Sequence, residues 1–288
     1  MTVKILIGAD PELFVKDIST GKYVSSHTFA PGTKKNPLRV DRGALQLDGT
    51  AFEFNIDPAE TKTEFVSNIA KVKGEMEKVV RQSFPGHNGI TLVADPVADY
   101  DAEYFSSIPG EALELGCEPD YNAYTQGPNP VPEVRSMFRT GSGHIHIGWT
   151  NKMDPFEDGH FQTCCEVVQQ LDWYLGLPSL LWDSEGKRRR ELYGKAGAFR
   201  PKSYGVEYRV LSNTWLRDER LIEFVFDNTT KAIRDMEAGN IAIDSWGQHA
   251  RNVINKGEPD VRMLKHASIP YPAFLEQNAT ETRRAKFG

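Results

Sequence analysis

The chain has 288 residues, of which 39% are hydrophobic and 10% aromatic, an ordinary composition for a soluble globular protein with room for one or two domains. The net charge of −6 argues against a protein that binds nucleic acid by general electrostatic attraction. The sequence has neither a basic-apolar-small N-terminal signal nor an apolar run long enough to span a membrane, so we expect no membrane association and a cytoplasmic location. Cys117, Cys164 and Cys165 form no C-x-x-C pair, which argues against a zinc knuckle and fits a reducing compartment.

The first informative stretch, G-A-D-P-E-L-F-V-K, follows the apolar run Val3–Ile7, which is a predicted strand. If the stretch is extended, Asp10 and Glu12 project from the same face, because residues two apart on a strand share a face. Two neighbouring carboxylates repel each other, and a divalent metal ion commonly offsets that repulsion. The alternative is a simple turn at Asp10-Pro11 with Glu12 as a solvated charge.

A hairpin return, a basic segment and a second hairpin come next. Lys22–Val24 is predicted to return from the first strand. Residues 29–42 predict a loop whose basic side chains would suit an anionic ligand or would simply be solvated; these are Lys34, Lys35, Arg39 and Arg42. Leu45–Ile56 has an Asp48-Gly49 turn followed by alternation, which places Glu53 on the polar face of a strand. That position is informative only if the face lines a cleft.

Three segments have the apolar spacing of helices: Glu64–Val80, Asp158–Leu177 and Leu221–Ala238. The basic run Lys187–Arg190 is typical of a solvated face, and Leu192–Arg200 predicts a flexible loop. These segments carry no chemistry of their own, but they separate the blocks that do.

Two later blocks place polar side chains on strand faces. T-G-S-G-H-I-H-I-G-W puts His144 and His146 on one face behind a glycine turn, a pattern that supports a metal or phosphate role about as well as a purely structural one. V-E-Y-R-V-L puts Glu207 and Arg209 on one face, where they either pair with each other or bind a metal and a phosphate.

In chain order these blocks resemble a known family. D-P-E-L-F-V, F-E-F-N-I, G-S-G-H-I-H, basic residues and V-E-Y-R-V are similar to the catalytic half of glutamine synthetase, which has E-P-E-F-F, a pair of glutamates, G-x-G-M-H-x-H, two phosphate-binding arginines and E-x-R. G-A-D-P-E, D-G-T-A-F-E-F-N-I, G-C-E-P-D-Y-N-A-Y and E-Y-R-V-L-S-N resemble still more closely the phage-type carboxylate-amine ligases of the glutamine synthetase and glutamate-cysteine ligase superfamily. The resemblance covers roughly residues 5–216 as separate blocks.

The resemblance implies an α+β fold with one glutamine-synthetase-like catalytic domain over residues 1–288, of which 217–288 form a helical part and tail. A curved, mostly antiparallel sheet would line an ATP-metal cleft with one face and pack helices on the other. Two or three divalent ions, Mg²⁺ or Mn²⁺, would be held by five residues: Asp10, Glu12, Glu53, His144 and Glu207. The family's second middle glutamate has no clear match, and Asp48 is its candidate. The small N-terminal domain of glutamine synthetase is missing, so glutamate is not implied as the substrate.

The implied activity is ATP-dependent formation of an amide or peptide-like bond between small-molecule or peptide carboxylates and amines, through an acyl phosphate. Arg209 would act on the transferring phosphoryl group, with Glu207 and Glu53 as further catalytic residues. The nucleotide would contact four residues: Arg200, Lys202, Arg190 and His146. Glu118 or Asp120 is the candidate base for the amine. A small-molecule kinase on the same site and an inactive ligand-binding module of the same fold are the alternatives. A homo-oligomer is left open, and a phage-encoded chain would act in the host cytoplasm.

Overall fold

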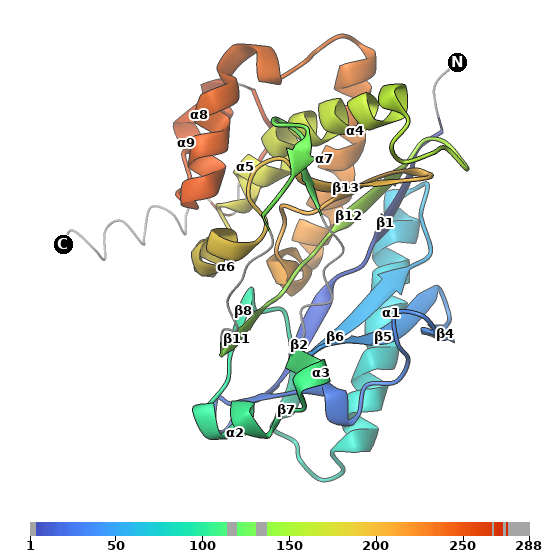
Figure 1. Cartoon of the computed structure of the whole chain (residues 1–288), viewed down its shortest axis with the longest axis vertical. Helices are drawn as coiled ribbons and strands as arrows, with labels where there is room; N and C mark the ends of the chain where they lie inside the picture. Colours follow the sequence, from blue (N-terminus) through green and yellow to red (C-terminus); the bar gives the residue numbers. More distant parts are fainter. Residues whose placement is uncertain (1–3, 114–119, 131–136, 267, 273–274, 276–288) are drawn as a thin grey trace, which may run out of the picture.

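The structure is a computed structural model that describes residues 4–113, 120–130, 137–266, 268–272 and 275. Within these ranges every strand pairing is antiparallel, and the strands form two larger sheets and one small pair. Helices pack on these sheets, so the molecule combines curled antiparallel sheets with helices (Figure 1). The mixed class expected from the sequence is confirmed.

The first sheet has six strands, of which five form a continuous order and the sixth pairs with one of these five. Their order is β3 (Tyr23–Val24), β2 (Glu12–Asp17), β6 (Ala51–Ile56), β5 (Gly43–Asp48) and β4 (Leu38–Val40), with β7 (Ile90–Val93) also paired to β2. The predicted Asp48-Gly49 hairpin is confirmed, and Gly49 has the positive φ of 61° that such a turn requires.

Two details of this sheet correct the sequence interpretation. β3 does return to a neighbouring strand, but its partner is β2 and not the apolar strand that starts the chain. The basic segment 29–42, predicted as loop throughout, contains β4, which pairs with β5 through Leu38 and Leu45. A three-residue edge strand has too short a pattern to be recognised in a sequence.

The second sheet also has six strands. Their order is β1 (Leu6–Ala9), β12 (Ile145–Gly148), β14 (Gly205–Tyr208), β13 (Ala198–Lys202), β9 (Tyr121–Asn122) and β10 (Gly127–Pro128). In its register His146 is the partner of both Gly8 and Glu207. The small pair is β8 (Val97–Asp99) with β11 (Phe138–Thr140).

The segment Asp10-Pro11 joins the two sheets. On one side the Asp10 and Glu12 amides donate to the carbonyls of His144 at 3.4 Å and Ser142 at 2.9 Å. On the other side the Pro11 carbonyl accepts from the Phe54 amide at 3.2 Å. Since proline has no amide proton to continue a ladder, the chain changes sheets here, and both carboxylates lie at the junction.

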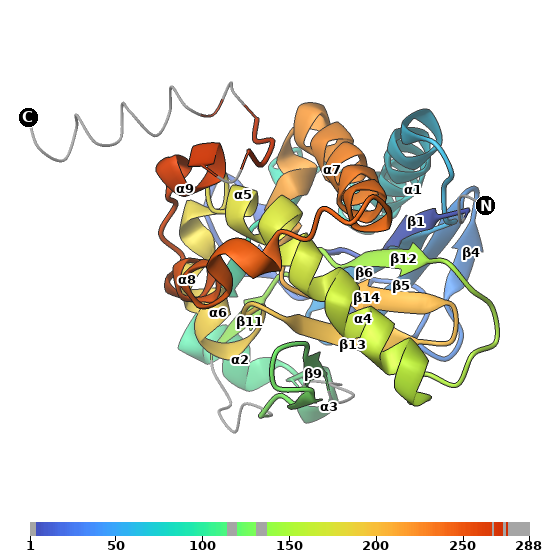
Figure 2. The same ribbon diagram turned by 90° about the horizontal axis from the view of Figure 1, so that it is seen from above.

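The helices predicted from apolar spacing are all present. They are α1 (Lys62–Ser83), α4 (Asp158–Leu171) and α7 (Glu219–Glu237). Thr61 caps α1 by accepting from the Glu64 amide at 3.2 Å. α4 continues through a π-helical turn, Asp172–Gly176, into α5 (Leu177–Ser179). Figure 2 shows α7 beside α1 and α4 crossing β13 and β14, contacts that fix which face of the sheets is covered.

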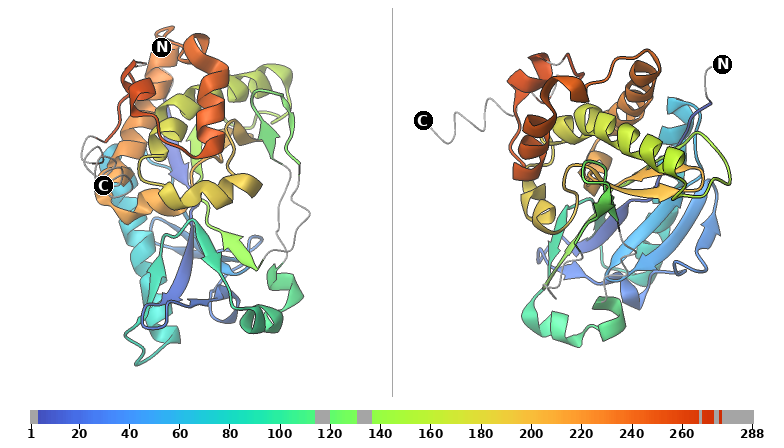
Figure 3. Two further views of the ribbon diagram at one scale, coloured as in Figure 1. Left: turned by 90° about the vertical axis from the view of Figure 1, so that its left-hand side faces the viewer. Right: turned by 45° about the horizontal axis from the view of Figure 1, so that its top comes forward.

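The remaining helices are α2 (Ala102–Ser107), α3 (Gly110–Leu113), α6 (Lys187–Leu192), α8 (Ile243–Lys256) and α9 (Val261–His266). Short 3₁₀ turns cover Ser26–Thr28, Ser184–Gly186 and Asn213–Arg217. Figure 3 shows α8 and α9 at the end of the molecule opposite α2. None of the helices in the described ranges is long and apolar enough to cross a membrane.

The core lies between the sheets and these helices. Along each strand, some side chains face this core and the others face away from it. On β6, Phe52, Phe54 and Ile56 belong to the main apolar cluster, which also contains residues of the second sheet and of α1, α4 and α7. On β12, Ile145 and Ile147 belong to the same cluster. Because side chains alternate along a strand, the residues between them face away from the helices. That opposite face carries the chemistry.

Candidate active site

A cavity of about 260 Å³ lies where the polar faces of the two sheets meet. It is lined by all five residues predicted to hold metal ions: Asp10, Glu12, Glu53, His144 and Glu207. Arg200, Lys202 and Arg209, predicted to act on the nucleotide or the transferring group, line it too. Residues that are more than 190 positions apart in the chain, such as Asp10 and Arg209, thus share one cavity.

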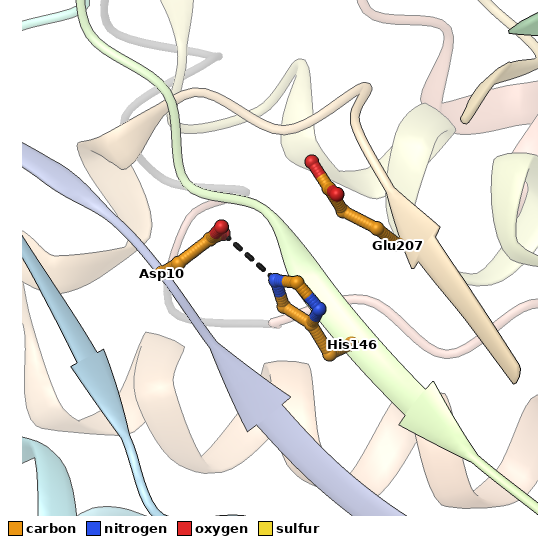
Figure 4. Close-up of side chains that lie close together, drawn as sticks. All are labelled: Asp10, His146 and Glu207. Atoms are coloured by element: carbon orange, nitrogen blue, oxygen red, sulfur yellow. Dashed lines mark ion pairs between the residues drawn. The ribbon is translucent and has the colours of Figure 1, made fainter. Parts of the chain in front are cut away.

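Asp10, His146 and Glu207 form the first acidic group of the site. Each offers one ligand atom, and these atoms lie within 4.8 Å of one another. Figure 4 shows the three side chains converging from neighbouring strands, with Asp10 Oδ1 3.0 Å from His146 Nε2. His144 lies beside them, because its Nδ1 is 3.4 Å from both Asp10 Oδ1 and Glu207 Oε1. The structure therefore brings both histidines to this group, although the resemblance assigned only His144 to a metal.

The charges around the first group keep its carboxylates ionised. Burial alone would raise the pKa of Asp10, but the two histidines beside it outweigh that effect and hold the pKa below its usual range. Burial is likewise outweighed at Glu207, whose pKa lies well below its usual range because Arg209 and the histidines surround it. Burial, with Arg209, lowers the pKa of His144 to about 4, so its imidazole is neutral near pH 7, as a metal ligand must be.

Glu12, Asp48 and Glu53 form the second acidic group, again with ligand atoms within 4.8 Å of one another. They come from β2, β5 and β6, and Glu12 is the register partner of Glu53. The Ser142 amide donates to Glu12 Oε2 at 2.9 Å, which ties this group to the glycine turn before β12. Asp48, the sequence candidate for the family's second middle glutamate, thus lies beside Glu53.

Burial and repulsion raise the pKa values of Glu12 and Glu53 in this second group, whereas at Asp48 burial is outweighed by the charges of Arg139 and Lys34, which hold the pKa below its usual range. Burial raises the pKa of Glu12 to about 6, and burial with the charge of Asp48 raises the pKa of Glu53 well above its usual range. Among the described residues, the buried Glu53 Oε2 has no hydrogen-bond partner. An oxygen in that position fits a divalent cation, because a buried polar atom otherwise needs a partner. Oxygen donors with one or two imidazoles suit Mg²⁺ or Mn²⁺.

Five basic side chains line the same cavity and pair with its carboxylates. Glu207 Oε1 and Oε2 are contacted by Arg200 at 3.2 Å, by Lys202 at 2.8 Å and by Arg209. In the second group, Lys34 Nζ is 3.0 Å from Asp48 Oδ2. Arg139 Nη2 is 3.3 Å from that same oxygen. Each acidic group therefore has its own basic partners.

Some residues of the cavity carried no signal in the sequence. Besides Arg139, they are Gln46, Thr140, Ser142 and Tyr193. The nearest sequence cue for Thr140 and Ser142 is the G-S-G turn before His144, whose pattern indicates a role for its glycines and the following histidines but not for its hydroxyl groups. Arg139 stands as a single basic residue in a three-residue strand, where nothing distinguishes it from a solvated charge.

Arg190, predicted to contact the nucleotide, is not among the described residues that line the cavity. It pairs with Asp183 at 2.7 Å, and both side chains are only 1% exposed. Its equally buried neighbour Arg189 donates to the carbonyls of Val210 at 2.8 Å and Arg209 at 3.2 Å. The basic run is therefore part of helix α6 with two arginines turned inward, and Arg189 supports the end of β14.

Of the two residues predicted as candidate bases for the amine, only Asp120 lies in the described part of the chain. Asp120 Oδ2 lies 3.5 Å from Arg209 Nε, so this carboxylate reaches the edge of the site as an ion-pair partner. Glu118 lies outside the described residues. Of the basic segment 29–42, Lys34 reaches the cavity, whereas Arg39 pairs with Asp57 at 2.6 Å on the surface.

A second, larger pocket of about 730 Å³ adjoins the cavity and shares Asp10, Gln46 and Glu53 with it. Its walls include Leu6, Ile56, Pro58, Trp149 and Tyr204. The Tyr204 hydroxyl lies 2.5 Å from His146 Nδ1, so this aromatic wall touches the first acidic group. An apolar, partly aromatic pocket beside a charged cavity suits a ligand with a flat ring and an anionic tail.

Over residues 132–238 the chain matches a family of carboxylate-amine ligases. The family is described as phage phiEco32-like COOH.NH2 ligase-type 2. The matched segment contains β12, β13 and β14, and with them His144, His146, Arg200, Glu207 and Arg209. The resemblance to phage-type carboxylate-amine ligases is thus confirmed over these residues, and the matched family is named as one of ligases. A search of curated proteins finds no match to the chain.

Proposed function

We propose that the protein is an ATP- and Mg²⁺-dependent carboxylate-amine ligase that works through an acyl phosphate. One observation carries the proposal: two groups of acidic residues and five basic side chains share one cavity, and nine of the fifteen described residues that line it lie in the segment that matches the ligase family. Structural ion pairs alone need far fewer buried charges, since each buried charge is costly.

The reaction requires this mixture of charges. A carboxylate is a poor acylating agent, so its oxygen attacks the γ-phosphorus of ATP, and ADP leaves. The nitrogen of the amine then attacks the carbonyl carbon of the acyl phosphate, phosphate leaves, and the nitrogen loses a proton as the amide forms. In the first step an anion approaches a polyanion, and divalent ions, when bound, offset that repulsion.

The residues would divide this work between the two acidic groups. Asp10, His146 and Glu207, with His144 beside them, would hold one ion, and Glu12, Asp48 and Glu53 would hold another. Arg200 and Lys202 would contact the nucleotide phosphates, because both are cations that line the cavity beside Glu207. Arg209 would face the transferring phosphoryl group, where its planar guanidinium stabilises the charge that spreads over the phosphoryl oxygens.

The adjoining pocket would hold the nucleoside of ATP. Trp149 and Tyr204 provide aromatic surface, and the pocket opens toward Asp10 and Glu53. A nucleoside in this pocket would direct its phosphates into the charged cavity. The carboxylate substrate would then approach from the side of the cavity that carries Arg139 and Tyr193.

The proposal is tested by thermal unfolding with ATP alone, Mg²⁺ alone and both together. A ligand that binds only the folded state raises the unfolding temperature in proportion to its occupancy, so both ligands together should give the largest shift. We expect Glu12→Ala to abolish the combined shift and Glu60→Ala, which removes an exposed carboxylate outside the cavity, to retain it. An equal shift in wild type and Glu12→Ala would contradict the proposed metal-nucleotide site.

A further inference from the structure

Arg139 and Lys34 lie against the second acidic group in a manner that the proposed reaction does not require. Arg139 Nη2 is 3.6 Å from Glu12 Oε1 and 3.3 Å from Asp48 Oδ2. Lys34 Nζ is 3.0 Å from the same Asp48 oxygen. The two cations come from different parts of the chain, β11 and the segment before β4, yet they converge on the same carboxylates.

These contacts offset a strong repulsion. Glu12, Asp48 and Glu53 are each at least 91% buried, and their ligand atoms lie within 4.8 Å of one another. Three carboxylates in such a position repel each other unless positive charge lies among them. Arg139 and Lys34 supply that charge in the protein without metal. They hold together a group of oxygens that would otherwise move apart.

A divalent ion on this group would use the same oxygens. Arg139 contacts Glu12 at 3.6 Å and Asp48 at 3.3 Å, and Lys34 contacts Asp48 at 3.0 Å, so an ion bound to these carboxylates would lie within a few ångströms of both cations. Two positive charges cannot share the oxygens without repulsion. This repulsion favours movement of the basic side chains away from the oxygens as the ion enters.

We propose that Arg139 and Lys34 are exchangeable counterions that neutralise Glu12 and Asp48 in the metal-free protein and leave these carboxylates when a divalent ion binds. The inference rests on the proposed metal site, and it adds the order in which the metal ion and the substrate bind. Once released, the guanidinium of Arg139 and the ammonium of Lys34 still line the cavity and are available to an anion. Metal would thus bind first and create the positive charge that an anionic substrate needs.

The proposal predicts that removal of a basic side chain increases the affinity for the metal ion. If the two cations merely supported the ligands, removing one would weaken metal binding. If they compete with the metal, removing one should strengthen it. A unit charge about 6 Å from a divalent ion opposes binding about tenfold even in a water-like dielectric. We therefore expect Arg139→Gln to bind Mn²⁺ about tenfold more tightly than wild type, and Lys34→Gln, whose side chain is half exposed, about threefold.

The experiment is a Mn²⁺ titration of the whole chain, without nucleotide and at mildly alkaline pH, with free Mn²⁺ measured by electron paramagnetic resonance. Lys35→Gln is the matched control, because Lys35 is an exposed neighbouring lysine that does not line the cavity as the described residues define it. Lys34→Gln keeps the test decisive if Arg139→Gln misfolds, since the half-exposed Lys34 side chain is less important for folding than the buried Arg139. Unchanged or weaker Mn²⁺ binding in Lys34→Gln and in folded Arg139→Gln would overturn the proposal.

A second readout separates this inference from the proposed function. In the absence of metal, Arg139→Gln should unfold at a lower temperature than wild type, because its carboxylates repel each other, and Mn²⁺ should stabilise the variant more than it stabilises wild type. Wild-type protein that binds no Mn²⁺ would overturn both the metal site and the exchange. Wild-type protein that binds Mn²⁺ while the variants bind it no better would overturn the exchange alone.

Discussion

His146 on β12 and Glu207 on β14 are direct register partners across an antiparallel strand pair. The backbone ladder therefore fixes the separation of an imidazole and a carboxylate before any side-chain contact is made. Asp10 reaches the same point from β1, and its Oδ1 lies 3.0 Å from His146 Nε2. A metal-binding group built on paired strands needs little rearrangement when an ion binds, because rigid elements hold its ligands.

This rigidity gives the first prediction. His146→Ala should remove one ligand while leaving the strand pairing intact, and we expect the rate of ADP release with a competent substrate pair to fall at least about 100-fold, with weaker Mn²⁺ binding. Glu237→Gln, an exposed carboxylate at the end of α7, serves as the control and should retain wild-type values. Normal turnover in His146→Ala would exclude His146 from the reaction.

The second prediction concerns the intermediate. A ligase that forms an acyl phosphate should convert its carboxylate substrate to a hydroxamate when hydroxylamine replaces the amine, and the product is measured by its colour with ferric iron. Arg209→Gln should lose this product as well as ADP release, because the guanidinium that faces the phosphoryl group is missing. A kinase acting on a hydroxyl group would release ADP and form a phosphate ester, but it would give no hydroxamate.

Strand alternation made half of the site predictable from the sequence. Asp10, Glu12, Glu53, His144, Glu207 and Arg209 each stand in a block whose apolar residues fix the buried face, so the polar face follows. The Asp48-Gly49 turn also fixes the register of β5 and β6, which brings Asp48 to Glu53's side of the sheet. Local patterns of this kind predict the position of a side chain correctly because each depends on only one strand or one hairpin.

The other half depends on contacts between distant segments. Arg139 meets Glu12 across 127 positions of the chain, and nothing local marks it. The run Lys187–Arg190 was expected to be solvated, yet α6 turns Arg189 and Arg190 inward, toward backbone carbonyls just after β14 and toward Asp183. A buried arginine and a surface arginine have the same sequence signature, and only its long-range partner distinguishes them.

A third prediction compares two glycines. A Cβ at Gly143, in the turn before His144, would overlap the Ser212 carbonyl and the indole nitrogen of Trp215, both fully buried, whereas a Cβ at Gly74 in α1 would meet nothing. We expect Gly143→Ala to destabilise the fold by about 2 kcal/mol or more and to weaken the Mg²⁺-dependent binding of ATP. Gly74→Ala should stabilise it by about 0.5–1 kcal/mol, because alanine favours a helix interior. Urea unfolding measures both, and equal effects would refute the packing argument.

The fourth prediction uses Asp172, which is fully buried at the start of the π-helical turn after α4. Burial raises the pKa of Asp172 from 3.8 to about 7, although hydroxyls of Tyr208 at 2.7 Å and Tyr124 at 2.9 Å donate to it. Between about pH 4 and pH 7 the folded protein therefore keeps a proton that the unfolded chain has lost. Stability from this group is complete below pH 4 and falls as the pH rises to 7, by about 4 kcal/mol in total.

Asp172→Asn cannot ionise, so it should lose this dependence on pH. Urea unfolding of wild type and Asp172→Asn from pH 4.5 to pH 8 should show the variant gaining stability relative to wild type as the pH rises, because wild type must then either bury a charge or hold its proton at increasing cost. Other buried acids such as Glu53 contribute equally to both proteins and cancel in the difference. Asp227→Asn, an exposed position on α7, should follow wild type throughout. Parallel curves for wild type and Asp172→Asn would mean that Asp172 is ionised in the folded protein, stabilised by its two tyrosines.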